Sequence, residues 1–410
     1  ANGGEGYFWS FRTSGCASGL CVLVQDASGK AVPNTEVALF ADLNSRPFGW
    51  YPTDATGFVQ FEDLHAGAYT LVTASNTAHF MVVKNITAPG LIKVNPSGTV
   101  AVTVNAQKLG GGALADAGIS FNPSPYGPGY LGDANENGSF TAWVTPGRTY
   151  AVSALGWDDR YSLGKSGVAV TSATTVNLFA NDMPVGHLTI NLDDFSKGYV
   201  APYSELSRLA APWFHFSSGD TFVFSALNYD LQVNPVISDG TNTWEYAFQK
   251  NITIENGGDS TLGVGGNLSL NTSVDKTSYN MGDWVTATHS FLDAYSNQLV
   301  AEWKYSGAGQ LKEHRVEINR SRNKNPQPAL SAPGAGESDD IYPDFMVKDP
   351  DGAIIFPDKD QEDQDPKRWY SRIFQLPVAG VPGIHTAELS LDTGLYQGVP
   401  TASATFDVSG

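Results

Sequence analysis

TDATGFVQFEDLHAGAYTLVTAS, residues 53–75, is the stretch that decides the fold. It begins with an Asx/Gly turn at 54–57, continues through an apolar run that ends at Phe61, turns again at 65–67, and resumes with a run through Tyr69. Two short apolar runs separated by such turns are typical of an antiparallel strand pair. We therefore expect this stretch to form the centre of a small β domain.

A version of the same stretch recurs about eighty residues later, as GDANENGSFTAWVTPGRTYAVSA at 132–154. In this comparison Phe61 corresponds to Phe140, and Tyr69 corresponds to Tyr150. A strand-built repeat of this period indicates two copies of one domain. The first copy has room for about seven strands, which is enough for a two-sheet sandwich.

The first copy carries a resemblance to a known family. Residues 21–75 contain V-x-D-x-x-G-x-x-[VA]-P-x-[TA]-x-V, then T-D-x-x-G-x-[VF], then L-x-x-G-x-Y-x-L. This order resembles the carboxypeptidase regulatory-like domain, a prealbumin-like β-sandwich akin to starch-binding-like modules and to the B-type repeats of Gram-positive adhesins. The resemblance implies the sandwich fold and a secreted setting, but it says little about function because such domains serve as spacers in many proteins.

The adhesin repeats can carry a Lys–Asn isopeptide bond that a glutamate in the strand after the Gly-x-Tyr turn catalyses. In this sequence the corresponding strands read TLVTAS at 70–75 and AVSALG at 151–156, without an acid. We therefore do not expect the crosslink in either copy.

Composition favours a secreted β protein. The 410 residues carry a net charge of −18 and include 43 glycines and 23 prolines, a mixture that favours strands and turns over helices. At roughly 100 to 150 residues per domain the length suggests three or four domains. An acidic chain lacks the basic face that nucleic acid requires, and no apolar run approaches the ~20 residues that span a membrane.

The two cysteines, Cys16 and Cys21, are separated by four residues. They are expected to form a disulfide, which requires an oxidising compartment, although a pair of buried thiols is the alternative. The chain starts without an initiator methionine or a hydrophobic leader, as expected for a mature extracellular product or for a fragment of a longer protein. We expect an extracellular or cell-surface location.

The sequence suggests five segments in an elongated array of antiparallel sandwiches. They are an aromatic amino-terminal segment (1–20), two regulatory-like sandwiches (21–96 and 97–180), a sandwich of uncertain type (181–266) and an immunoglobulin-like sandwich (267–410). The fourth segment lacks the T-D-x-x-G turn. The last contains D-K-x-x-Y-x-x-G-D-x-V, which resembles the first strands of immunoglobulin-like and macroglobulin-like domains, and it is interrupted by a long acidic insertion.

Four aromatic residues near the amino terminus are expected to take part in assembly: Tyr7, Phe8, Trp9 and Phe11. A run this apolar would form an exposed patch if it stayed in solvent. We expect it to be buried against the first domain or against a neighbouring molecule. In the second case it can add as a strand to an open sheet edge, and such head-to-tail contacts polymerise because they do not close.

No catalytic motif is found in the sequence: GxSxG and HExxH are absent, and the histidines are scattered. We therefore expect no enzyme activity. Five carboxylates form a dense run that is either a solvated loop or a calcium site: Asp358, Asp360, Glu362, Asp363 and Asp365. Calcium is the one cofactor that the sequence suggests.

Loop aromatics provide a candidate carbohydrate site, since flat exposed rings stack on sugars. The candidates are Trp50, Tyr51, Trp157 and Tyr161, and the alternative is that these rings are buried where successive domains meet. N-x-[ST] motifs, which matter only if the source glycosylates its proteins, occur at Asn85, Asn137, Asn251, Asn267, Asn271 and Asn319.

These observations favour a non-catalytic extracellular structural protein, a surface or filament subunit whose sandwich domains assemble head to tail into a homopolymer. One alternative is the carboxy-terminal accessory region of a larger secreted hydrolase, such as a subtilisin-like peptidase, that contacts substrate or cell wall. Another is a carbohydrate-binding module.

Overall fold

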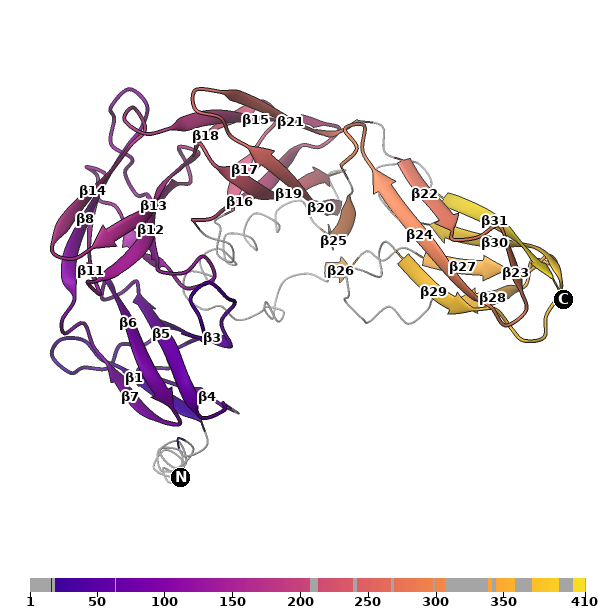
Figure 1. Ribbon diagram of the computed structural model, residues 1–410. Coiled ribbons are helices and arrows are strands. Elements are labelled where there is room, and N and C mark those ends of the chain that lie inside the picture. The colour runs from indigo at the N-terminus through magenta and orange to yellow at the C-terminus, as the bar shows by residue number, and fades with distance from the viewer. Residues whose placement is uncertain are drawn as a thin grey trace.

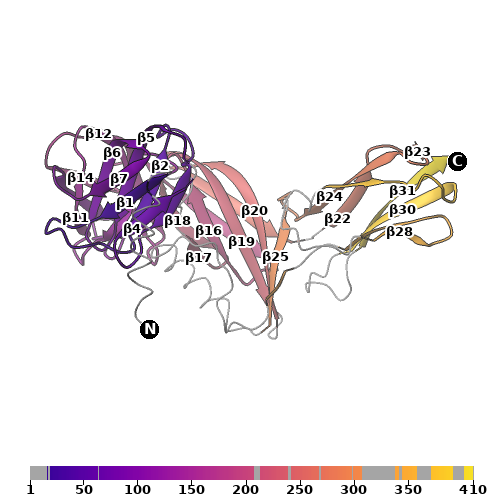
Figure 2. The ribbon, with the colours of Figure 1, turned by 90° about the horizontal axis from the view of Figure 1, so that it is seen from below.

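The computed structural model describes residues 16, 19–62, 64–206, 213–238, 242–266, 269–297, 299–306, 338–340, 344–357, 371–390 and 401–409. These residues form strands and turns and contain no helix, so the predicted all-β fold class is confirmed. Figure 1 shows the sheets following one another along an arch, with β1 (Leu20–Val24) near one end and β30 (Gly383–Ser390) near the other. In the view from below in Figure 2, the strands of residues 20–179 overlap, and the later strands extend away from them.

The first repeat comprises seven strands, which are β1 (Leu20–Val24), β2 (Glu36–Phe40), β3 (Gly49–Pro52), β4 (Phe58–Phe61), β5 (Gly67–Ser75), β6 (Phe80–Ala88) and β7 (Gly90–Val94). In its first sheet β1 lies between antiparallel β4 and parallel β7. In its second sheet β2 lies between β3 and β5, and β5 pairs with β6. β4 ends its three-stranded sheet, so its outer edge has no strand beside it in the described part of the chain.

The second repeat has the same topology. Its strands are β8 (Val100–Gln107), β9 (Gly118–Asn122), β10 (Tyr130–Asp133), β11 (Ser139–Val144), β12 (Arg148–Gly156), β13 (Tyr161–Val170) and β14 (Thr174–Phe179). β8 lies between antiparallel β11 and parallel β14, and β9 lies between β10 and β12. Even the isolated bridge after the first strand recurs, as Gln25↔Ala31 and Gln107↔Ala113.

One correspondence expected from the sequence is wrong by two residues. Val22 faces Val59 in the first repeat, and Val104 faces Phe140 in the second. Phe140 therefore corresponds to Val59, not to Phe61. The large ring occupies a neighbouring core position in each copy, so matching ring to ring misaligned the strands.

Residues 181–266, for which the sequence predicted a sandwich of uncertain type, form a third repeat. Its strands are β15 (Val185–Asp193), β16 (Lys197–Tyr203), β17 (Phe214–Phe216), β18 (Asp220–Ser225), β19 (Asn228–Ser238), β20 (Asn242–Thr253) and β21 (Asp259–Gly265). β15 lies between antiparallel β18 and parallel β21, and β16 lies between β17 and β19, as in the first two repeats. The chain thus contains three copies of one seven-stranded unit.

The turn before the fourth strand shows why the third copy escapes a motif search. Glycines with positive φ occupy this turn at an interval of 81 residues, as Gly57, Gly138 and Gly219. In the first repeat Asp54 precedes the glycine and its carboxylate accepts the backbone N–H of Phe58. In the third repeat the acid follows the glycine, and Asp220 accepts the N–H of Ser217 instead. The geometry is retained while the order of residues changes.

The last domain packs two sheets around its own core. Its strands are β22 (Ser269–Val274), β23 (Ser278–Asn280), β24 (Trp284–Leu292), β27 (Asp344–Lys348), β28 (Ile354–Pro357), β29 (Ser371–Gln375), β30 (Gly383–Ser390) and β31 (Thr401–Ser409). The sheets run β22-β24-β29 and β23-β31-β30-β27-β28. Tyr279, Val285 and Phe406 are among the buried residues between them. Two further strands, β25 (Val300–Ser306) and β26 (Ser338–Asp340), extend the second sheet of the third repeat beyond β20.

Candidate functional site

The first joint between repeats is a continuation of one sheet into the next. β6 of the first repeat pairs in parallel with β11 of the second, with Phe80 opposite Trp143. The Trp143 N–H donates to the carbonyl of His79 at 2.9 Å. The hydroxyl of Thr145 then accepts the N–H of Val83 at 3.0 Å and ends the ladder.

The second joint repeats this arrangement between β13 and β18, again in parallel, with Tyr161 opposite Val223. The Val223 N–H donates to the carbonyl of Arg160 at 3.0 Å, and the Ser225 hydroxyl accepts the N–H of Gly164 at 2.9 Å. A seven-stranded sheet therefore spans each of these two joints.

A residue in the left-handed region supplies the acceptor carbonyl at each joint, directly before β6 in the first and directly before β13 in the second. His79 has φ 52° and Arg160 has φ 60°. Non-glycine residues adopt this conformation rarely, and these two are 81 residues apart, the interval that separates the turn glycines. The same backbone bend thus presents the same carbonyl to the next repeat twice.

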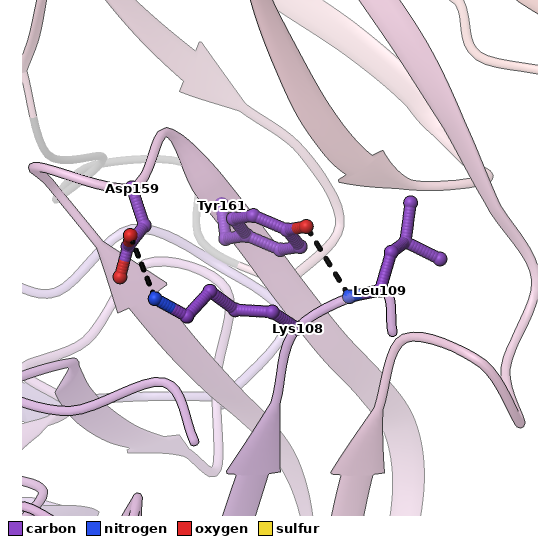
Figure 3. A network of polar contacts seen from close by, with 4 residues as sticks. All are labelled: Lys108, Leu109, Asp159 and Tyr161. Atoms are coloured by element: carbon purple, nitrogen blue, oxygen red, sulfur yellow. Dashed lines mark hydrogen bonds and ion pairs between the residues drawn. The ribbon is translucent and has the colours of Figure 1, made fainter. Parts of the chain in front are cut away.

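Side chains brace the second joint on both sides, as Figure 3 shows in part. Lys108 forms an ion pair with Asp159 at 2.9 Å, and the backbone N–H of Leu109 donates to the Tyr161 hydroxyl at 3.2 Å. On the other side Arg160 contacts the carboxylate of Asp220 at 2.7 Å. These contacts hold the turn that carries Arg160 to both the second and the third repeat.

The apolar core also crosses the first joint. Val37 and Leu39 of β2 face the core of the first repeat, whereas Ala38 and Phe40 of the same strand belong to the core of the second. Six buried residues of the first repeat lie in this shared core: Ala38, Phe40, Val72, Ala74, Met81 and Val83. The second sheet of the first repeat is therefore buried on both faces, which explains why β2 has an almost continuous apolar sequence.

Small residues line the outer face of the second sheet of the second repeat. A Cβ atom on Gly164 would lie 2.4 Å from Leu206 Cδ1, and one on Gly118 would lie 2.3 Å from the Trp157 ring. Asn122 donates from Nδ2 to the Leu206 carbonyl at 2.9 Å. Close approach of Leu206 of the third repeat at Gly164, and of Trp157 of the second repeat itself at Gly118, thus depends on the absence of larger side chains.

The turn 293–297 docks the last domain onto the third repeat by a different route. The Asp293 carboxylate accepts the N–H of Gly265 at 2.9 Å, and Asn297 donates from Nδ2 to the carbonyl of Gly263 at 2.9 Å. The Tyr295 hydroxyl donates to Asp193, and its ring lies against Gly263. Phe291 of β24 is also buried in the core of the third repeat. Within the described residues no parallel strand pairing like that of the other two joints connects the last domain to the third repeat.

The four candidate sugar-binding aromatics do not form one surface. Trp50 packs against the shared core, and Trp157 lies over Gly118. Tyr161 also packs on the shared core and accepts the hydrogen bond at Leu109. Tyr51 points to the opposite side of β3 from Trp50, is 49% exposed, and lies 5.4 Å from Phe61 between ring centroids.

The disulfide between Cys16 and Cys21 is present, at the start of β1. Four N-x-[ST] asparagines are exposed: Asn85, Asn137, Asn251 and Asn271. Several predicted residues lie outside the described residues, namely Tyr7, Phe8, Trp9, Phe11, Asn267, Asn319, Asp358, Asp360, Glu362, Asp363 and Asp365. Assembly through the amino terminus and calcium in the acidic run therefore stay predictions.

One half-buried acid borders the first joint. Glu36 lies on the face of β2 that carries Ala38 and Phe40, opposite Ala74 of β5. Burial raises the pKa of its carboxyl from 4.5 to about 8, because the charged form loses solvation there. Within the described ranges, no three His, Cys, Asp or Glu side chains are grouped so that they could hold a metal ion. A search of the same ranges finds no helix suited to crossing a membrane.

Sequence reasoning missed the joints. The residues that make the joints belong to no sequence motif: His79, Thr145, Arg160 and Ser225. A left-handed conformation at a non-glycine residue cannot be recognised from a single sequence. The usable signal was the interval of 81 residues, which the turn glycines and the pair His79 and Arg160 share.

Comparison with known proteins gives distant likenesses only. No protein family matches the chain, and no curated protein is similar to it in sequence. Among solved structures, a DUF3823 family protein of Bacteroides uniformis aligns at 9% identity over 55% of this chain and 100% of its own, with a TM-score of 0.16. A streptococcal ancillary pilin aligns at 11% identity over 60% and 98%, with a TM-score of 0.16. The major pilin subunit of Bacillus cereus aligns at 9% identity over 60% and 98%, with a TM-score of 0.14.

Proposed function

We propose that this chain is a non-catalytic structural protein of the cell surface or extracellular space, a subunit that associates end to end. The observation that carries the proposal is the pair of equivalent joints, in which one sheet and one core continue from repeat to repeat. Independent domains on flexible linkers would share neither ladder nor core. A continuous array of this kind is suited to holding its two ends at a set separation.

Two further observations support the proposal. The disulfide next to β1 is typical of proteins outside the reducing cytoplasm. The aromatic residues of the first 15 positions form an apolar segment directly before that disulfide, and such a segment favours burial against another surface.

Size-exclusion chromatography with light scattering, together with negative-stain microscopy, tests the proposal on the full chain. We expect a series of oligomers or filaments, and monomers after deletion of residues 1–15. A matched full-length control replaces Tyr7, Phe8, Trp9 and Phe11 by serine and should behave like the deletion. Monodisperse rods from the unmodified chain at every concentration would contradict the assembly and favour an accessory spacer of a larger protein.

A further inference from the structure

The outer face of the first sheet of the first repeat is more apolar than its counterparts. On β1, β4 and β7, core residues alternate with side chains that point to the other side of the sheet. We call the surface made by these side chains the first outer face, and strand register places on it Cys21, Leu23, Phe58, Gln60, Leu91 and Lys93. Leu91 is 50% exposed, Leu23 and Phe58 are half-buried, and Cys21 carries the disulfide.

The second repeat has polar side chains at all of the corresponding positions. They are Thr103, Asn105, Ser139, Thr141, Thr175 and Asn177. The Thr103 and Thr141 hydroxyls lie 2.9 Å apart, and Asn105 donates from Nδ2 to the Asn177 side chain at 3.1 Å. In the third repeat the hydroxyls of Thr189 and Thr221 are also 2.9 Å apart. A sheet face in water is polar in this way, whereas the first outer face has the composition of a covered face.

The disulfide brings the amino-terminal segment to this same face. Cys21 is fully buried, belongs to the first outer face, and is bonded to Cys16. Its neighbours across the sheet are Gln60 of β4 and Leu91 of β7. Phe11 is five positions before Cys16, and five residues span up to about 17 Å, whereas adjacent strands are only about 4.8 Å apart. The aromatic residues can therefore reach the first outer face from their own tether.

A shallow cavity of about 400 Å³ borders the first outer face. Phe58, Val59 and Gln60 of β4 and Pro52 of β3 are among the residues that line it. Gln60 lies directly opposite Cys21, so the cavity opens beside the disulfide. Binding cavities of this size admit ring systems, which gives an aromatic side chain a place to enter.

From the tether, the apolar composition and the cavity, we propose that the aromatic segment 7–11 docks on the first outer face of its own chain. A short linker gives an effective concentration on the order of millimolar, which favours this occupant over a second molecule. The inference goes beyond the proposed end-to-end association and does not depend on it. A segment that is already held in place loses less conformational entropy when a second copy contacts it.

The test is limited chymotrypsin digestion of the full chain, at a concentration where light scattering shows monomers. Chymotrypsin cleaves after aromatic residues, and mass spectrometry follows release of the fragments that end at positions 7–11. We expect cleavage at least about tenfold slower than in a synthetic peptide of residues 1–15, because docked residues are cleaved only after they open. Leu91→Asp should remove most of this protection, since docking would desolvate the new carboxylate, and Leu91→Met should retain it.

Thr175→Asp is the matched control, because Thr175 occupies the position of Leu91 in the second repeat. It should leave the cleavage rate within about twofold. Leu91 is an exposed residue on a strand that ends its sheet, so Leu91→Asp should fold, which circular dichroism and thermal unfolding verify.

A full chain cleaved as fast as the free peptide overturns the inference, as does equal cleavage of Leu91→Asp and its parent. Protection that is lost on dilution also overturns it, because a second copy then holds the segment. Oligomers with an unprotected segment refute the inference and leave the proposed assembly intact. A protected segment on a chain that stays monomeric at every concentration refutes the assembly and leaves the inference intact.

Discussion

Replacing Phe40 by alanine should loosen the second repeat although Phe40 belongs to the first. The ring is fully buried on β2 and lies in the core shared with Ile119, Phe121 and Val152 of the second repeat. Removal of a buried phenylalanine ring costs about 3–5 kcal/mol. Because the ring packs between the repeats, we expect most of this cost to fall on the contact between them.

Hydrogen exchange followed by mass spectrometry measures the effect repeat by repeat. At about 1.4 kcal/mol for each factor of ten, a loss of about 3–5 kcal/mol raises exchange through local opening by about two to four orders of magnitude. We expect this increase in peptides from β9 and β12 as well as in those from β2 and β5. Amides of the last domain should exchange as before.

Leu39→Ala is the matched control. Leu39 is the neighbouring residue on the same strand, is equally buried, and faces the separate core of the first repeat. It should raise exchange in the first repeat while leaving local opening of β9 and β12 nearly unchanged. If Phe40→Ala leaves the protection of β9 and β12 intact, the repeats are independent units and the argument from a shared core fails.

Three further predictions concern single sites. Gly138→Ala should lower the unfolding temperature far more than Gly110→Ala. Both glycines have positive φ, but only at 138 would the new Cβ lie 2.3 Å from a backbone oxygen, that of Ala106. Equal losses of unfolding temperature in calorimetry would contradict the close approach. Glu36 binds its proton more tightly in the folded chain, so the free energy of unfolding should fall as pH rises from about 4.5 to about 8, and Glu36→Gln should flatten that slope in urea titrations. Thr145→Ala removes the hydroxyl that ends the first ladder and should cost about 1 kcal/mol, with Thr145→Ser restoring most of it; a loss in both variants would mean that the methyl group matters instead.

The sequence predicted the strands of the first repeat well because its turns carry strong local signals. Asp54 and Gly57 define a turn by their own chemistry, and the alternation around them reports the sheet. The third repeat was not recognised because Asp220 supplies the turn carboxylate from the other side of Gly219. The same turn can form with its carboxylate before or after the glycine, and a sequence motif describes only one of these orders.

The joints were beyond the reach of local reasoning for another physical reason. Pairing of β6 with β11 joins residues about sixty positions apart. The sequence of neither strand indicates which of its edges will pair with a strand of another repeat. The aromatics were misleading in the same way. Trp50 and Tyr51 are adjacent in sequence, yet one ring is packed in the shared core and the other is half in solvent.

β4 is the first repeat's counterpart of β11 and β18, and its outer edge is the one that the two joints would use. Directly after it stands Glu62, an exposed carboxylate, at the place where β11 has Trp143. A charged side chain at an open edge discourages an incoming strand. The edge that unites the repeats within one molecule therefore ends in a negative charge in the first repeat, and a strand arriving there from elsewhere would have to accommodate it.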